Sequence, residues 1–249
     1  SLAGTTALSN VPISVVPVGV VEAYSHRFQL GPAPGGISVG HYAITAGTLG
    51  CLAVRGDRLL ILSNNHVLAN SNSANVGDCI CQPGPLDGGV CPRDQVALLE
   101  RFVPINFSGG INYLDCATAW AYLDRVRPEL MYLSNGQVVF FRVGNAPVAP
   151  TVNMIVGKTG RTTQLRQGRV TAIGVQVSVN YGNGRVGVFQ DQIAITGTAS
   201  DGIFSQGGDS GSLIWQWQGL QPVGLLFAGG GTTTFANRKN DEWQTPTLR

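Results

Sequence analysis

The residue best suited to nucleophilic chemistry is Ser210, in the stretch "GGDSGSLI". It stands between Asp209 and Gly211, directly ahead of an apolar run. A serine hydroxyl attacks a carbonyl efficiently only with three aids: a base within hydrogen-bond reach, a group that orients this base, and backbone donors for the oxyanion. An isolated Gly-Asp-Ser-Gly stretch is otherwise an ordinary turn. The chemistry of Ser210 therefore depends on partners elsewhere in the chain.

The base has to be one of only three histidines. His66 lies in "RLLILSNNHVLAN", where an apolar strand runs into a polar turn, so its imidazole is expected at the rim of a core. His26 and His41 lie in a Pro/Gly-rich N-terminal region with weaker strand context. A capping or core role is the ordinary alternative for any of them. His66 is the preferred base.

The orienting acid should be semi-buried, because a carboxylate orients an imidazole best when water is excluded. Asp115 in "NYLDCATAWA" stands amid apolar residues at the head of a predicted strand. Asp94 and Asp124 have more polar surroundings. A structural carboxylate held by backbone donors remains the alternative for Asp115.

The elements that must position these residues are predicted to be short strands. The chain has 249 residues, 43% of them hydrophobic, with 34 glycines and 13 prolines against 12% charged residues. Such a composition favours an all-β fold with repeated antiparallel pairing, and "NYGNGR" is typical of a hairpin turn. Short helices are expected at 124–130 and just after His66. The Pro- and Gly-rich stretch 127–150 is the expected boundary between two halves.

Composition also limits the partners. The net charge of +2 comes with no cluster of Lys or Arg, so nucleic acid is not an expected partner. No apolar run reaches the roughly 18 residues that span a bilayer, so the chain is expected to be soluble, with no membrane partner. No targeting segment is visible, although one could already have been removed. Compartment and oligomeric state stay open.

Five cysteines leave at least one unpaired: Cys51, Cys79, Cys81, Cys91 and Cys116. Three of them lie in "CICQPGPLDGGVC" without a nearby histidine, so a local disulfide or free thiols rank above a metal site. Neither a metal nor another cofactor is expected. This loop is interpreted as an excursion from the body of the fold.

The order His66, Asp115, Ser210 resembles that of the chymotrypsin-like (trypsin-fold) serine peptidases. The matching stretches are "SNNHVLA", "LDCATA" and "GGDSGSL", and "GKTGRTTQLRQGRVTAIG" resembles a segment of the bacterial branch. Each motif alone is weak, but four in the right order are strong together. The resemblance spans about 47–235.

This resemblance implies two six-stranded antiparallel β-barrels with the active site between them. Residues 1–46 would form an N-terminal arm, 47–130 the first barrel with the histidine and aspartate, and 131–249 the second barrel with the serine. The implied activity is that of a serine endopeptidase acting on a peptide or protein substrate through an acyl-enzyme.

The roles follow residue by residue from the same resemblance. Ser210 would attack the scissile carbonyl, His66 would take and return the proton, and Asp115 would hold the imidazole tautomer. Backbone N–H groups of Gly208 and Ser210 would form the oxyanion hole. Asp209 would pair with an internal cation, either Arg161 or Lys158, both in the Gly-Arg-Thr-Thr-like segment.

Substrate contacts are also implied. Phe204 would lie at the base of the pocket for the side chain preceding the cut, and Phe227 would replace a histidine that glutamate-cutting relatives place beside it. The pocket wall and the strand that pairs with the substrate backbone would be formed by Ala228, Gly229 and Gly230. We therefore expect cleavage after small to medium apolar residues.

Two departures from the family pattern limit the resemblance, and a non-enzyme alternative is weighed beside it. Ser212 follows Gly211 where the family has a second glycine, and Val67 replaces a cysteine after the histidine. The alternative is a catalytically silent or latent binding or scaffold module of the same fold. Against it, no triad position is substituted. A zinc hydrolase is a third class, but this sequence has no HExxH motif or comparable cluster of metal ligands.

Overall fold

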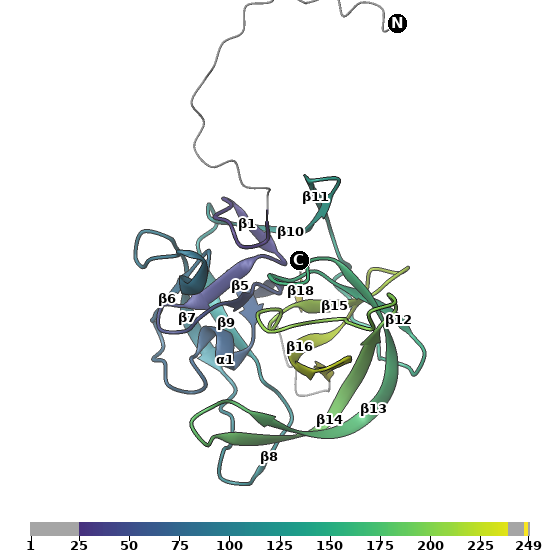
Figure 1. Cartoon of the computed structure of the whole chain (residues 1–249). Helices are drawn as coiled ribbons and strands as arrows, with labels where there is room; N and C mark the ends of the chain where they lie inside the picture. Colours follow the sequence, from purple (N-terminus) through teal and green to yellow (C-terminus); the bar gives the residue numbers. More distant parts are fainter. Residues whose placement is uncertain (1–24, 239–246, 249) are drawn as a thin grey trace, which may run out of the picture.

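The computed structural model describes residues 25–238 and 247–248 of the chain. This part consists almost entirely of β-strands, arranged as two rounded halves side by side (Figure 1). The expected all-β fold is confirmed. The first 24 residues of the expected N-terminal arm, where a targeting segment was sought, lie outside the described residues. In the described ranges no helix is long and apolar enough to cross a membrane.

The first half is an antiparallel sheet that closes on itself. Its strand order is β18-β4-β5-β9-β7-β6-β2-β3. Because β3, at one end of this order, leads directly along the chain into β4, next to the other end, the sheet curls into a ring. The strands are β2 (Ser38–His41), β3 (Gly47–Thr48), β4 (Cys51–Arg55), β5 (Arg58–Ser63), β6 (Cys79–Cys81), β7 (Gln95–Phe102), β9 (Ala117–Ala121) and β18 (Thr247–Leu248).

The second half is a closed antiparallel barrel. Its order is β13-β12-β15-β16-β17-β14, and the pairing of β13 with β14 closes it. Strand β8 (Ile111–Asn112), from the first half of the chain, adds to β14 in parallel. The barrel strands are β12 (Ile155–Lys158), β13 (Arg166–Asn180), β14 (Val186–Gly197), β15 (Leu213–Gln216), β16 (Pro222–Gly230) and β17 (Thr233–Arg238).

A third, small sheet occupies the expected boundary between the halves. It contains β1 (Ala33–Gly35), β10 (Val126–Ser134) and β11 (Gln137–Phe141), in the order β1-β10-β11. The helix expected at 124–130 is wrong, because Pro128 lacks the N–H that a helix interior needs. Asn135 and Gly136, both at positive φ, instead turn β10 back into β11.

The described part of the expected arm is built into the fold. β1 pairs in parallel with β10, and β2 pairs with β6 in the first barrel's sheet. Residues 38–41 therefore belong to that sheet.

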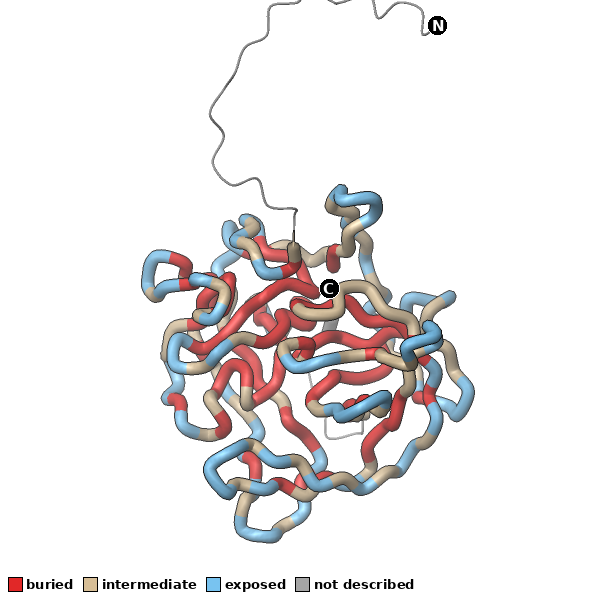
Figure 2. The backbone as a smooth tube through the Cα atoms, viewed as in Figure 1, coloured by how far each residue is buried: buried red, intermediate tan, exposed pale blue. Residues whose placement is uncertain are grey.

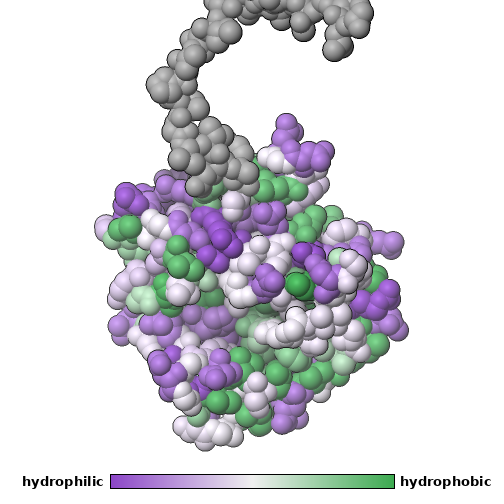
Figure 3. Space-filling view, viewed as in Figure 1, coloured by the Kyte–Doolittle hydropathy of each residue, from purple (hydrophilic) through white to green (hydrophobic). Residues whose placement is uncertain are grey.

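Buried residues fill both halves and the space between them (Figure 2). One apolar cluster joins the halves, packing Leu60 and Leu62 of β5 with Trp215 and Leu225 of the second barrel. On the surface, hydrophobic and hydrophilic residues are mixed over the face shown in Figure 3. The two halves therefore share an apolar contact, which packs β5 of the first half against the second barrel.

The buried His26 leads to a prediction about acid stability. Its Nε2 lies 3.0 Å from Thr159 Oγ1, while its Nδ1 has no partner in the described part of the chain. Burial lowers the pKa of His26 to about 4 from its ordinary 6.5. Between these values the unfolded chain binds a proton that the folded chain does not, so stability falls as pH falls from about 6.5 toward 4.

We expect this one group to cost about 3 kcal/mol of unfolding free energy by pH 4. The measurement is urea denaturation at pH 7 and pH 4.5, for the wild type and for His26→Gln. The variant should lose markedly less stability on acidification. An identical acid-induced loss in both proteins would contradict the prediction.

Candidate active site

His66 and Asp115 form a close pair in the first half. His66 lies on the single-turn helix α1 (Asn65–Leu68), which is fastened by the buried Val67 and Leu68. Its Nδ1 is 2.6 Å from Asp115 Oδ2, and its backbone N–H donates to Asp115 Oδ1 at 3.3 Å. The Asp115 side chain is fully buried, whereas that of His66 is 22% exposed. The carboxylate thus fixes the orientation of the ring through Nδ1, and Nε2 is left free to exchange a proton.

Asp115 is held from both halves. Asn64 Nδ2 donates to its carbonyl at 2.7 Å. From the second barrel, Asn237 Oδ1 accepts its backbone N–H at 3.0 Å, and the Tyr181 hydroxyl donates to its Oδ2 at 2.8 Å. The orientation of the His66 ring therefore depends on the fit between the halves.

Tyr181 is a residue of the candidate site that sequence reasoning missed. It lies in the turn between β13 and β14, with its ring edge-on to His66 at 5.8 Å between centroids. Burial and the neighbouring Asp115 carboxylate raise the pKa of Tyr181, so it stays a neutral donor. The stretch "NYGNGR" indicated a hairpin turn, and β13 and β14 do pair across it. Nothing in that pattern points to a long-range contact with Asp115.

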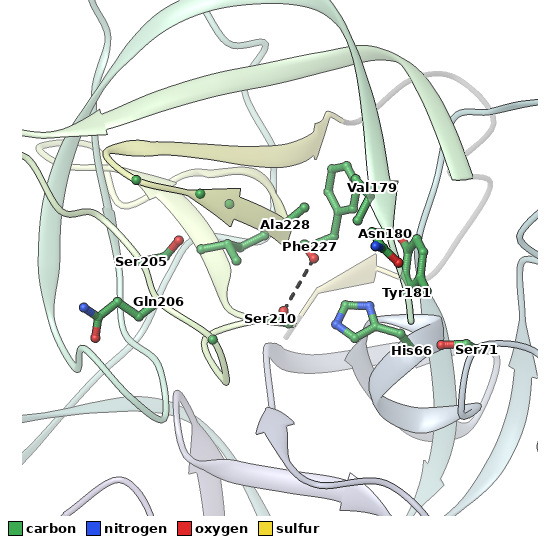
Figure 4. A pocket seen from close by; sticks show the side chains of 15 residues that line it. His66, Ser71, Val179, Asn180, Tyr181, Ser205, Gln206, Ser210, Phe227 and Ala228 are labelled. Atoms are coloured by element: carbon green, nitrogen blue, oxygen red, sulfur yellow. Dashed lines mark hydrogen bonds between the residues drawn. The ribbon is translucent and has the colours of Figure 1, made fainter. Parts of the chain in front are cut away.

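Ser210 faces the same cleft as His66 (Figure 4). The cleft has a volume of about 590 Å³. Ser210 Oγ donates to Phe227 O at 3.4 Å, a long hydrogen bond that a small rotation would break. The structure therefore brings His66, Asp115 and Ser210 together, with the serine rotamer directed at Phe227.

Glycines give the Ser210 loop its shape. Gly208 and Gly211 have φ values of +95° and +93°, which glycine adopts without strain. A Cβ at Gly211 would also lie 2.0 Å from Ser63 Oγ and 2.3 Å from Thr48 O. Glycine is therefore required at 211 by both conformation and space.

The two expected oxyanion donors are available. Within the described ranges, neither the Gly208 N–H nor the Ser210 N–H has a hydrogen-bond acceptor. The carbonyls beside them are occupied: Thr48 Oγ1 donates to Gly208 O at 2.9 Å, and Ser212 Oγ donates to Asp209 O at 2.6 Å. Ser212, the departure from the family pattern, thus stabilises the turn.

Asp209 is a buried anion, and its cation is Lys158. Lys158 Nζ lies 3.1 Å from Asp209 Oδ2, and both side chains are fully buried. Burial lowers the pKa of Lys158 to about 8 in spite of Asp209. Burial alone would raise the pKa of Asp209, but Lys158 and the Thr163 hydroxyl hold it below its ordinary value. Of the two expected cations, Lys158 is confirmed.

Arg161 has a different partner. Its Nε and one terminal nitrogen contact the Asp87 carboxylate at 2.5 and 2.6 Å. Asp87 lies in the 3-10 turn η1 (Pro85–Asp87), inside the loop closed by the Cys79–Cys91 disulfide. That loop therefore reaches the second barrel, and its interpretation as an excursion from the fold is wrong.

The expected substrate-binding residues are only partly at the cleft. Phe204 is fully buried in the core of the second barrel and does not line the cleft. The next residue, Ser205, lines it instead. Phe204 lies at a bend in the chain, and the adjacent side chains of Phe204 and Ser205 face the core and the cleft respectively. The other four expected residues line the cleft: Phe227, Ala228, Gly229 and Gly230.

The remaining candidates lie outside the cleft. His41 Nε2 pairs with Asp78 at 3.1 Å, Asp94 pairs with Arg93, and Asp124 is exposed. The thiols of Cys51, Cys81 and Cys116 are free. In the part of the chain that the structure describes, no cluster of three or more His, Cys, Asp or Glu side chains could hold a metal.

The Lys158–Asp209 pair leads to a stability prediction. In Lys158→Met the Asp209 carboxylate would stay buried without a cation, so we expect a loss of about 3–5 kcal/mol in unfolding free energy. The matched control is Arg166→Met, because Arg166 pairs with the partly exposed Asp201. That change should cost no more than about 1 kcal/mol. Urea denaturation measures both, and equal losses would contradict the prediction.

Comparisons with known proteins identify the fold. No protein-family model matches the sequence. No curated protein matches it either. Among solved structures, Thermobifida fusca protease A superposes with a TM-score of 0.59 at 17% identity, covering 87% of this chain and 98% of that one.

Two further solved structures have the same fold as this chain. Cellulomonas bogoriensis chymotrypsin gives a TM-score of 0.56 at 20% identity, over 85% of this chain and 94% of that one. A glutamic-acid-specific serine protease gives 0.60 at 18% identity, over 87% of this chain and 100% of that one. The chain therefore has the two-barrel fold of the bacterial chymotrypsin-like serine proteases.

Proposed function

We propose that this chain is a serine endopeptidase that hydrolyses peptide bonds through an acyl-enzyme on Ser210. The observation that carries the proposal is the His66–Asp115 pair at 2.6 Å, facing the same cleft as Ser210. The fold, shared with bacterial serine proteases, supports it. A peptide or protein is the substrate class that this chemistry fits.

In the acylation step, the hydrogen bond from Ser210 Oγ to Phe227 O breaks. Ser210 Oγ then attacks the scissile carbonyl while His66 Nε2 takes its proton. Asp115 stabilises the imidazolium that forms; the Tyr181 hydroxyl donates to this carboxylate, and Asn237 holds the backbone N–H of Asp115. His66 then protonates the leaving amine. A water molecule, deprotonated by His66, then attacks the acyl carbon; the bond to Ser210 Oγ breaks, His66 returns the proton to Oγ, and the acid product leaves.

The oxyanion formed in both steps would be bound by the N–H groups of Gly208 and Ser210. Donors already aimed at the developing charge need no reorganisation during the reaction, and each contributes about 100- to 1000-fold in rate. The geometry of the loop is therefore as important to the proposal as the serine itself.

The substrate backbone would pair with the outer end of β16. Ala228, Gly229 and Gly230 pair with β17 on one side. On the other side, β15 pairs with β16 only as far as Leu225. The free edge beyond that point can add an extended peptide as a further strand. Gly229 and Gly230 leave this edge exposed.

Catalysis through Ser210 can be tested with a fluorophosphonate probe, which bonds covalently to an activated serine. We expect one label on the wild-type chain, none on Ser210→Ala, and strongly reduced labelling of His66→Ala. Mass spectrometry of the labelled peptide locates the site. A folded wild type that takes no label would contradict the proposal and favour a silent or latent binding module.

The cleft also predicts specificity. Among the described residues that line it there is no Asp, Glu, Lys or Arg, and its titratable groups are His66 and Tyr181, of which Tyr181 stays neutral because burial raises its pKa. Burying an unpaired charged side chain there would be unfavourable. The glutamic-acid-specific structural neighbour uses a histidine triad in substrate binding, which this cleft lacks. We therefore expect cleavage after small to medium apolar residues.

A peptide library digested by the wild type and by Ser210→Ala measures this preference. Ser205→Asp should shift cleavage toward Arg and Lys, because Ser205 lines the cleft and Phe204 does not. The matched change Phe204→Leu, in the core, should leave the preference unchanged. Dominant wild-type cleavage after Arg, Lys or Glu would refute the expectation.

A further inference from the structure

The orientation of the Gly207–Gly208 peptide decides whether the first oxyanion donor exists. In a trans peptide the C=O and the N–H point in opposite directions, so fixing the carbonyl of Gly207 fixes the direction of the Gly208 N–H. Gly208, at φ +95°, imposes little conformational restraint of its own. Some other group therefore has to hold this peptide.

Thr162 is that group. Its Oγ1 donates to Gly207 O at 2.8 Å, and within the described ranges this carbonyl has no other donor. The second oxyanion peptide, Asp209–Ser210, is held redundantly. Its carbonyl accepts both the hydroxyl and the backbone N–H of Ser212, at 2.6 and 3.0 Å. The Gly207 carbonyl thus depends on one hydroxyl from a distant segment.

Arg161 fixes the direction in which that hydroxyl donates. A threonine hydroxyl can donate or accept, but a guanidinium only donates. One terminal nitrogen of Arg161 donates to Thr162 Oγ1 at 3.2 Å. With Oγ1 accepting from Arg161, the hydroxyl hydrogen of Thr162 is left for Gly207 O.

Asp87 in turn holds Arg161. Both side chains of this pair are only 7% exposed, and the contact is bidentate. The Asp87 carboxylate also accepts from Ser38 Oγ at 2.5 Å. A chain of hydrogen bonds therefore runs from the disulfide-closed loop of the first half, through Arg161 and Thr162, to the Gly207 carbonyl.

We propose that Thr162 is a positioning residue that keeps the Gly208 N–H directed at the oxyanion, with Arg161 and Asp87 holding its hydroxyl in the donating direction. The catalytic part of this inference rests on the function proposed above. The structural part, the orientation of one peptide, does not.

The test compares three variants. Thr162→Val keeps the side-chain shape and removes the donor, Thr162→Ser keeps the donor, and Thr171→Val is the matched control. The Thr171 hydroxyl also donates to a backbone carbonyl, that of Ala194, but on the barrel strand β13. Each protein is crystallised, and kcat and KM are measured on a peptide substrate.

Thr162→Val should show the Gly207–Gly208 peptide rotated or in two orientations, with kcat lowered about 10- to 100-fold and KM nearly unchanged. Thr162→Ser and Thr171→Val should stay within about 3-fold of the wild type in kcat. An unchanged peptide in the Thr162→Val crystal overturns the inference, whatever the activity. An inactive wild type would instead refute the proposed function, and the crystal structures would still decide the peptide orientation.

The variant Arg161→Lys distinguishes the hydrogen-bond chain from Asp87 through Arg161 to Thr162 from a general effect of the positive charge. It keeps the cation but cannot contact both Asp87 oxygens and Thr162 with a planar fork. We expect a lower kcat in the wild-type background and less than about 2-fold further loss in Thr162→Val. Equal losses in both backgrounds would show that Arg161 does not act through Thr162, and would overturn that part of the inference.

Discussion

The buried ion pair between Asp209 and Lys158 is the constraint on which the loop of Ser210 depends. A carboxylate without water around it is stable only when its oxygens are satisfied. Besides Lys158, Asp209 accepts from the backbone N–H groups of Thr162, Thr163 and Gln206. The segment around Gly160 has to come close for this, since a Cβ there would lie 2.6 Å from Asp209 Oδ1. The Gly-Arg-Thr-Thr motif thus surrounds the Asp209 carboxylate and donates hydrogen bonds to it.

A second constraint joins the two halves at Asp115. His66 and Asp115 come from the first half, whereas Tyr181, which donates to the Asp115 carboxylate, and Asn237, which accepts the Asp115 backbone N–H, come from the second. Behind them the apolar cluster around Trp215 packs against β5. A displacement of one half relative to the other would therefore move the His66 ring and the Ser210 loop apart. The geometry of the site is a property of the packed interface.

Much of the fold and of the candidate site could be predicted because it depends on local sequence patterns. The strands follow the spacing of apolar runs and turn residues, and the shape of the Ser210 loop follows from its glycines. Lys158 could be named as one of two cations for Asp209 because both lie in one motif. The misses have a common cause. The roles of Tyr181 and Asp87 arise from contacts between segments far apart in sequence, and the local pattern around each indicates only a turn. Phe204 lies in the core while its neighbour Ser205 lines the cleft, and no local sequence pattern shows which of the two faces the core.

The Gly207–Gly208 and Asp209–Ser210 peptides, whose N–H groups we propose as oxyanion donors, are supported in different ways. The Asp209–Ser210 peptide is held by Ser212, two residues further along the same loop, so this part of the loop supports itself. The Gly207 carbonyl is held by Thr162, and the hydroxyl of Thr162 takes its direction from Arg161, whose partner Asp87 belongs to the other half. The Ser210 loop therefore has all its hydrogen bonds only when the first half, with its disulfide-closed loop, is folded against the second. Contacts between the two halves thus support both the His66–Asp115 pair, through Tyr181 and Asn237, and the Gly207–Gly208 peptide, through Asp87, Arg161 and Thr162.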